Sequence, residues 1–203
     1  MIRWYFLIFS LFSVCLLSAC TTSTHKPQPV SAGKIFEGDL LNVTAPNSDG
    51  WHLLESSFRG IAFARFGNEP GESFIAQVTI FFNPPQTDSP EKFEALIVKG
   101  AQSDLETERF STSAYTHEYS DSRGYPCVLL HNISEDRRAD TGKGGIKTLI
   151  LQNEHLYCRH PVRKDLGFAI TYSHRGNSLY HDLKKEAQEF IDGVQVPSRF
   201  TTQ

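Results

Sequence analysis

The sequence has no excess of basic residues. Its 203 residues include 20 Lys or Arg against 23 Asp or Glu, which gives a formal net charge of −3. Loss of an N-terminal processing segment that contains Arg3 would make the charge one unit more negative. Proteins that bind nucleic acid need a basic patch for the phosphate backbone, so we do not expect nucleic acid as a partner. The composition also offers no polybasic segment for an anionic membrane surface.

The motifs of the common catalytic sites are also missing. The sequence contains no CxxC pair for disulfide exchange, no GxSxG nucleophile elbow and no HExxH zinc motif. The stretch GKGG at 142–145 has the lysine of a phosphate-binding loop but lacks the upstream glycine and the Ser or Thr after the lysine. We therefore expect no cofactor, and the sequence indicates no particular reaction.

The N-terminus has the three parts of a secretory signal. Arg3 supplies a positive charge, an apolar run covers 4–17, and small residues precede position 20. The uncharged stretch is shorter than the ~20 residues that a membrane-spanning helix needs. The sequence LSAC at 17–20 resembles the lipobox of bacterial lipoproteins, in which the cysteine becomes the first mature residue and carries lipid.

This resemblance implies that residues 1–19 are removed as a signal peptide and that Cys20 carries acyl chains such as palmitate. Thr21, and not Asp, follows the cysteine, which by resemblance to the sorting signals of Gram-negative lipoproteins implies the outer membrane. Residues 20–34 would be the lipidated end and a flexible tether, because Ser, Thr, Gly and Pro keep such a segment solvated. Residues 35–203 are expected to form one globular domain with an aromatic-rich core.

Lipoprotein processing would leave two cysteines in the mature domain. Cys15 would leave with the signal peptide and Cys20 would carry lipid, so Cys127 and Cys158 would remain in a compartment that permits disulfides. We predict that these two cysteines pair. The alternative is a pair of free, buried thiols.

The hydropathy pattern predicts an α+β fold, mainly an antiparallel sheet flanked by two amphipathic helices. Helices are expected over 90–105 and from 177 or 178 to 191. The charged, glycine-rich stretch 134–145 predicts a long hairpin tip, and 153–154 predicts a turn. Residues 40–43 are expected either to add a short strand or to pack against the domain edge. Strands are expected at 51–56, 60–66, 74–82, 110–119, 125–133, 146–152, 156–158 and 167–173.

The order of these elements carries a second resemblance. Strands YCRHP at 157–161 and ITYS at 170–173 would pair, and an amphipathic helix would close the domain. This layout over residues 50–195 resembles the Mog1/PsbP-like α/β/α sandwich. The resemblance implies three layers and a non-enzymatic binding or assembly role, which most members of that family have. No functional residue of the family maps onto a matching motif here.

Three groups of polar residues are candidates for a site. Acidic residues of the second helix, Asp182, Glu186 and Glu189, are expected on its solvated face. The candidates for a metal cluster are His131, His155, His160 and His174, although their spacing matches no metal motif, and strand-end surface positions are the alternative for His160 and His174. A basic cluster for an anionic ligand or an acidic partner would comprise Arg159, His160, Arg163, Lys164, His174 and Arg175; ordinary loop charge is the alternative.

The leading functional hypothesis is a lipid-anchored, non-enzymatic binding or assembly module that faces the periplasm and has a protein partner in the envelope. The second is a periplasmic hydrolase or another enzyme whose site is built from dispersed residues. The third is a purely structural envelope protein. A deep pocket with convergent polar groups would favour the enzyme, whereas an exposed apolar or basic patch would favour the binding module.

Overall fold

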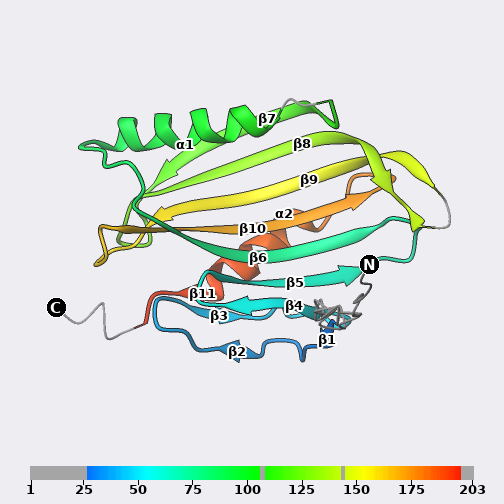
Figure 1. Ribbon diagram of the computed structural model, residues 1–203, viewed down its shortest axis with the longest axis horizontal. Helices are drawn as coiled ribbons and strands as arrows, with labels where there is room; N and C mark the ends of the chain where they lie inside the picture. The colour runs from blue at the N-terminus through cyan, green and yellow to red at the C-terminus, as the bar shows by residue number, and fades with distance from the viewer. Residues whose placement is uncertain (1–26, 106–107, 143–144, 198–203) are drawn as a thin grey trace, which may run out of the picture.

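The body of the protein is an eight-stranded, fully antiparallel sheet with the strand order β1-β4-β5-β6-β10-β9-β8-β7 (Figure 1). The computed structural model describes residues 27–105, 108–142 and 145–197. The strands are β1 (Gln28–Pro29), β4 (His52–Ser57), β5 (Gly60–Phe66), β6 (Ser73–Phe82), β7 (Phe110–Ser120), β8 (Cys127–Asp140), β9 (Ile146–Arg159) and β10 (Leu166–Gly176).

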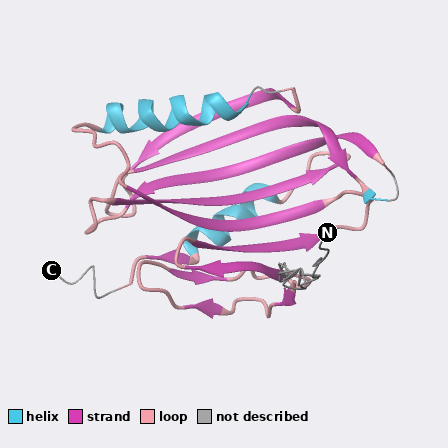
Figure 2. Cartoon of the chain, viewed as in Figure 1, coloured by secondary structure: helices cyan, strands magenta, loops and turns pink. Residues whose placement is uncertain are grey.

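A smaller sheet and two helices complete the described part of the chain (Figure 2). The smaller sheet has the order β11-β3-β2, formed by β2 (Ile35–Phe36), β3 (Asn42–Thr44) and β11 (Val194–Gln195). The helices are α1 (Pro90–Leu105) and α2 (Leu183–Asp192). The prediction of an α+β fold with a mainly antiparallel sheet and two helices is confirmed. Among the described residues, no helix has the length and apolar character needed to cross a membrane.

The main core lies between α2 and one face of the large sheet. Four apolar residues of α2 are buried, and β10 opposes them with Phe168, Ile170 and Tyr172. The rings of Phe63 and Phe190 meet edge to face, with centroids 6.3 Å apart. Each fully buried aromatic or branched side chain contributes about 1.5–3 kcal/mol, so this layer fixes α2 on the sheet.

Helix α1 begins where the sequence predicts. The backbone N–H of Lys92 donates a hydrogen bond to the Oγ of Ser89, which caps the helix, and Pro90 occupies the first helical position. Phe93 is buried, and the guanidinium of Arg159 lies 5.0 Å from its ring centroid. Successive side chains of a strand point to opposite faces of the sheet. Arg159 is an odd-numbered residue of β9, whereas the core under α2 contains even-numbered residues of that strand, so Arg159 points to the opposite face from that core.

Three expectations about element boundaries were wrong. Strand β8 continues to Asp140, so the tip predicted from 134 begins after that residue. Strand β9 runs without a turn through Asn153 and Glu154, both of which are buried. Helix α2 starts at Leu183 and not at 177 or 178 as predicted. The chain at 177–182 lacks helical structure, and Asp182 precedes the helix without a side-chain cap.

The predicted disulfide between Cys127 and Cys158 is confirmed. The two cysteines are directly opposite each other on β8 and β9, and both are buried. A bridge over 31 residues stabilises the fold by roughly 3–4 kcal/mol in the chain-entropy model. It joins β8 to β9 at the end of the sheet where β9 leads into the β9–β10 loop.

Candidate functional site

An apolar cleft of about 400 Å³ lies between the large sheet and the segment that joins β2 to β3. Its residues come from β5, β6, the start of β10 and that segment, because alternate side chains of these strands point to the same side of the sheet. Glu37, Asp39 and Arg163 add charge to its walls. The apolar walls include Leu40, Leu41, Ile61, Val78, Ile80 and Leu166.

Two exposed phenylalanines stand at the mouth of this cleft. Phe58, at the tip of the β4–β5 hairpin, is 75% exposed, and Phe82, at the end of β6, is 44% exposed. Their ring centroids are 6.4 Å apart, and the guanidinium of Arg59 lies 5.7 Å from the Phe58 ring. The tight turn itself is held by the N–H of Arg59, which donates to the Oγ of Ser57. An exposed aromatic ring is not needed for that turn, so the pair is a candidate surface for binding.

A second, more polar cavity of about 350 Å³ lies over β7, β8 and β9, beside the start of α2. Glu154, which is only 5% exposed, forms part of its wall, and its Oε1 lies 2.8 Å from Nδ1 of His131. From the sequence, His131 is a candidate only for metal binding, and a turn is predicted at Glu154. Strand register is what brings the two residues together.

The sequence predicts a solvated position for Glu186, but this residue is the centre of a polar network. Its carboxylate accepts hydrogen bonds from the hydroxyl of Tyr172 at 2.5 Å, the hydroxyl of Tyr180 at 2.7 Å and Nη2 of Arg65 at 3.1 Å. Burial, followed by the nearby carboxylate, raises the pKa of Tyr172 above its usual value. These contacts tie α2 to β5 and β10, which is a structural role. Asp182 and Glu189 are exposed.

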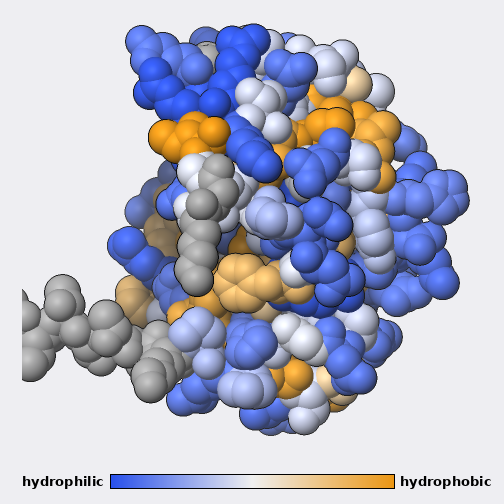
Figure 3. Space-filling view, turned by 90° about the vertical axis from the view of Figure 1, so that its right-hand side faces the viewer, coloured by the Kyte–Doolittle hydropathy of each residue, from blue (hydrophilic) through white to orange (hydrophobic). Residues whose placement is uncertain are grey.

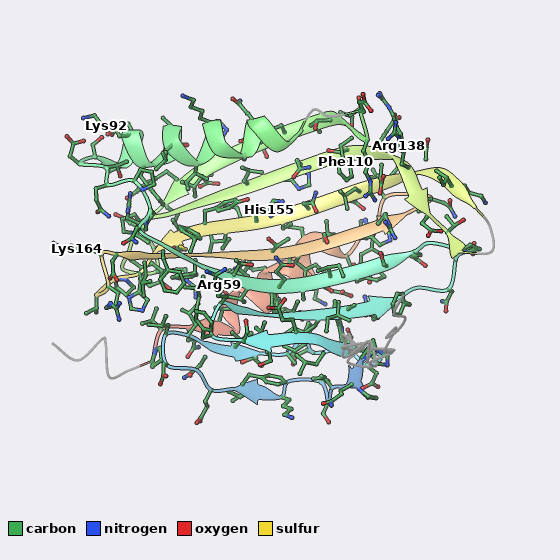
Figure 4. The ribbon with its side chains drawn as sticks, viewed as in Figure 1. Arg59, Lys92, Phe110, Arg138, His155 and Lys164 are labelled. Atoms are coloured by element: carbon green, nitrogen blue, oxygen red, sulfur yellow. A yellow bond between two sulfur atoms is a disulfide. The ribbon has the colours of Figure 1, made fainter. Side chains whose placement is uncertain are left out.

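The six basic residues predicted as one cluster lie at two ends of the molecule. Strand β10 separates the group at 159–164 from His174 and Arg175, and Figure 4 shows Lys164 at one end.

In the first group, Arg163 pairs with Asp165 at 2.8 Å, Nη2 of Arg159 donates to the carbonyl oxygen of Pro85, and His160 is buried. In the second, Nε2 of His174 lies 3.2 Å from Glu72, and Nη1 of Arg175 lies 3.5 Å from Asp136. The six residues therefore do not form a single surface.

The four candidate histidines are also dispersed. His131 and His155 lie on opposite faces of the sheet, because one pairs with Glu154 and the other with Leu130. Burial, with a smaller contribution from His131, lowers the pKa of His155 to about 4. Within the described ranges, no group of three or more His, Cys, Asp or Glu side chains is arranged to hold a metal ion. The predicted lipidation site, Cys20, lies outside the described residues.

Comparison with known proteins gives a weak likeness of fold. No family model matches the sequence, and no curated protein matches it. A solved structure titled as a mutant of the protein Mog1 matches with a TM-score of 0.42 and 13% identity, over 86% of this chain and 98% of that one. The class that the structure supports is therefore an α+β protein built on a mainly antiparallel sheet.

Proposed function

We propose that the protein is a lipid-anchored envelope module that binds an apolar segment of another envelope protein in the cleft beneath Phe58 and Phe82. It would be held in the outer membrane by acyl chains on Cys20, with its domain in the periplasm. The observation that carries the proposal is the pair of exposed phenylalanine rings at the mouth of an apolar cleft. Aromatic anchors over an apolar pocket are typical of the energetic centre of protein interfaces.

The position of the tether supports this use of the cleft. Strand β1, which lies just after the described chain begins, pairs with Leu53 and His52 at the start of β4. Phe58 follows the end of β4, which at ~3.3 Å per residue places it roughly 20 Å away along the strand. The cleft therefore lies away from the point where the lipid tether would join the domain. Figure 3 shows another side of the molecule, on which hydrophilic residues cover most of the surface.

The chemistry of the mouth favours a protein partner. Interface centres are enriched in aromatic residues and arginine, and Phe58, Phe82 and Arg59 supply these. Burying an exposed phenylalanine contributes about 1.5–3 kcal/mol, which corresponds to roughly a tenfold to hundredfold change in Kd. An apolar side chain from the partner would fill the cleft, and polar groups would pair with Arg59 and Arg163 at its edge.

Co-purification with single variants tests the proposal. Phe58→Ser should reduce the amount of partner recovered with the full-length protein from detergent-solubilised membranes by at least tenfold. Phe66→Ser is the matched control, because Phe66 is 69% exposed at the opposite end of β5 and does not line the cleft. Equal recovery with both variants, or no stoichiometric protein partner with the wild type, would refute the proposal. Recovery of lipid alone would assign the cleft to a lipid ligand and would also contradict it.

The arrangement of the two helices on the large sheet is also part of this proposal. We infer a three-layer α/β/α arrangement because α1 and α2 contact side chains of opposite parity on β9. Phe93 of α1 packs with Arg159, whereas α2 belongs to the core that contains Leu156 and Cys158. A binding module of this design presents its loops and hairpin tips at the ends of the sheet, where the cleft lies.

A hydrolase is the second candidate, favoured by the contact between His131 and the buried Glu154. A carboxylate bonded to Nδ1 orients an imidazole as a base in many hydrolases. Among the described residues, however, no hydroxyl or thiol hydrogen-bonds the His131 ring. Loss of ester or amide hydrolysis on His131→Ala, with the fold retained, would support the enzyme, whereas the absence of any hydrolysis by the wild type would eliminate it.

A further inference from the structure

The polar cavity beside α2 is independent of the apolar cleft and has its own chemistry. Strand register aligns Thr116, His131 and Glu154 in one row across β7, β8 and β9. Residues Tyr180, His181, Leu183 and Lys184 close the cavity from the side of α2. The cavity therefore combines side chains from three strands and from the segment that enters α2.

Glu154 is the unusual member of this row. Its side chain is 93% buried, and one donor from the described protein, Nδ1 of His131, lies within hydrogen-bond distance, at Oε1. An ionised carboxylate accepts several hydrogen bonds, and a buried charge is normally paired. No donor within the described ranges bonds the second oxygen, Oε2, and this atom is not among the fully buried polar atoms that lack a partner, so it is open to the cavity whose wall Glu154 helps to form. One acceptor of a largely buried carboxylate is thus open to a ligand.

The charge of the cavity indicates which kind of donor fits. Glu118 of β7 is a second carboxylate in the wall, and neither it nor Lys184 forms an ion pair with any described residue. Among the Asp, Glu, Lys and Arg side chains of the wall, two carboxylates face one ammonium. A cationic N–H group would balance the excess charge and satisfy Oε2, whereas an anion would meet two carboxylates.

We propose that this cavity binds a primary ammonium group of a small ligand, held by Oε2 of Glu154 and by the carboxylate of Glu118. The apolar side chains of Leu129 and Leu183 and the ring of Tyr180 would contact the carbon chain next to the nitrogen. His131 would act as a positioning residue, because its contact with Oε1 holds the carboxylate in place. The proposal does not depend on the use of the apolar cleft.

Titration of the full-length protein in detergent with n-propylammonium chloride tests the proposal. The signal followed is the NMR resonance of the His131 ring, assigned through His131→Gln, at constant ionic strength maintained with sodium chloride. The neutral 1-propanol, which has a similar size and shape, is the matched control ligand. We expect a saturable shift with the ammonium ion in the millimolar range of Kd and none with the alcohol.

Variants decide which groups hold the ligand. Glu154→Gln should weaken propylammonium binding by at least tenfold and Glu118→Gln by about threefold, because the second carboxylate is exposed. Glu135→Gln, on β8 but outside this cavity, should leave it unchanged. Glu118 is exposed, so Glu118→Gln should fold. This variant therefore tests the proposal even if Glu154→Gln does not fold. Equal shifts with 1-propanol, no saturable shift, or wild-type affinity in Glu154→Gln or Glu118→Gln would overturn the proposal.

Discussion

Replacing Glu186 with alanine should destabilise the fold far more than replacing an exposed residue of α2. The substitution removes the acceptor of three hydrogen bonds, two of them from tyrosines and one from Arg65. Tyr172 is 0% exposed, so its hydroxyl would be left without a partner at a cost of about 1–3 kcal/mol. Arg65 is 17% exposed and would lose its counter-charge. Together these effects give about 3–5 kcal/mol.

Urea denaturation of the oxidised protein measures this loss. With an m-value of about 1–3 kcal/mol/M, the midpoint should fall by roughly 1–3 M. Glu189→Ala is the matched control, because Glu189 is an exposed residue of the same helix and should change the free energy of unfolding by less than about 0.5 kcal/mol. Tyr172→Phe in the Glu186→Ala background should recover part of the loss, since it removes the orphaned hydroxyl. Similar midpoints for Glu186→Ala and Glu189→Ala would refute the assigned role.

Three other predictions concern stability and location. Burial lowers the pKa of His155 to about 4, against 6.5 in the unfolded chain, so the unfolded state binds the proton first as the pH falls. The free energy of unfolding should therefore decrease by up to about 3 kcal/mol between pH 6.5 and pH 4, and an equally steep decrease in His155→Gln would contradict this. Cys127→Ser should lower the free energy of unfolding by about 2–5 kcal/mol in chemical denaturation, and an unchanged midpoint would count against a stabilising bridge. Cys20→Ala should move the protein from the membrane fraction to the soluble fraction; continued membrane association would disprove lipid anchoring.

Local patterns predicted the parts of the fold that depend on neighbouring residues. Strand β6 alternates apolar and polar residues, and Ser89 and Pro90 mark the start of α1, so both elements were predicted close to their observed bounds. The pairing of Cys127 with Cys158 followed from the number of cysteines that would remain after processing. In these cases the information lies within a few residues or in a simple count.

Long-range pairing explains what the sequence did not predict. The stretch after Ser134 is charged, yet it continues β8 because Asp136 accepts two hydrogen bonds from Arg109 and lies 3.5 Å from Arg175. Glu154 remains inside a strand because His131 pairs with it across the sheet. A charged residue can lie in a solvated loop or in a strand where it pairs with a residue distant in sequence. The sequence alone does not distinguish these two situations.

The candidate site was missed for a related reason. Phe58 and Phe82 have the composition of core residues, and only the three-dimensional structure shows that nothing in the described chain covers them. The predicted basic cluster was based on proximity in sequence, but residues 166–173 of β10 separate its two parts. A sequence pattern indicates which residues prefer burial, whereas the unfilled surface is a property of the assembled fold.

Photo-cross-linking in intact cells is the most direct test of the central claim, that the cleft of a lipid-anchored domain binds a protein partner. A photoreactive phenylalanine analogue would replace Phe58 in one strain and Phe66 in another, followed by isolation of membranes. If the cleft binds a protein, position 58 should give one discrete protein adduct in the membrane fraction and position 66 should give none. The same adducts from both positions, or no adduct from position 58, would contradict it.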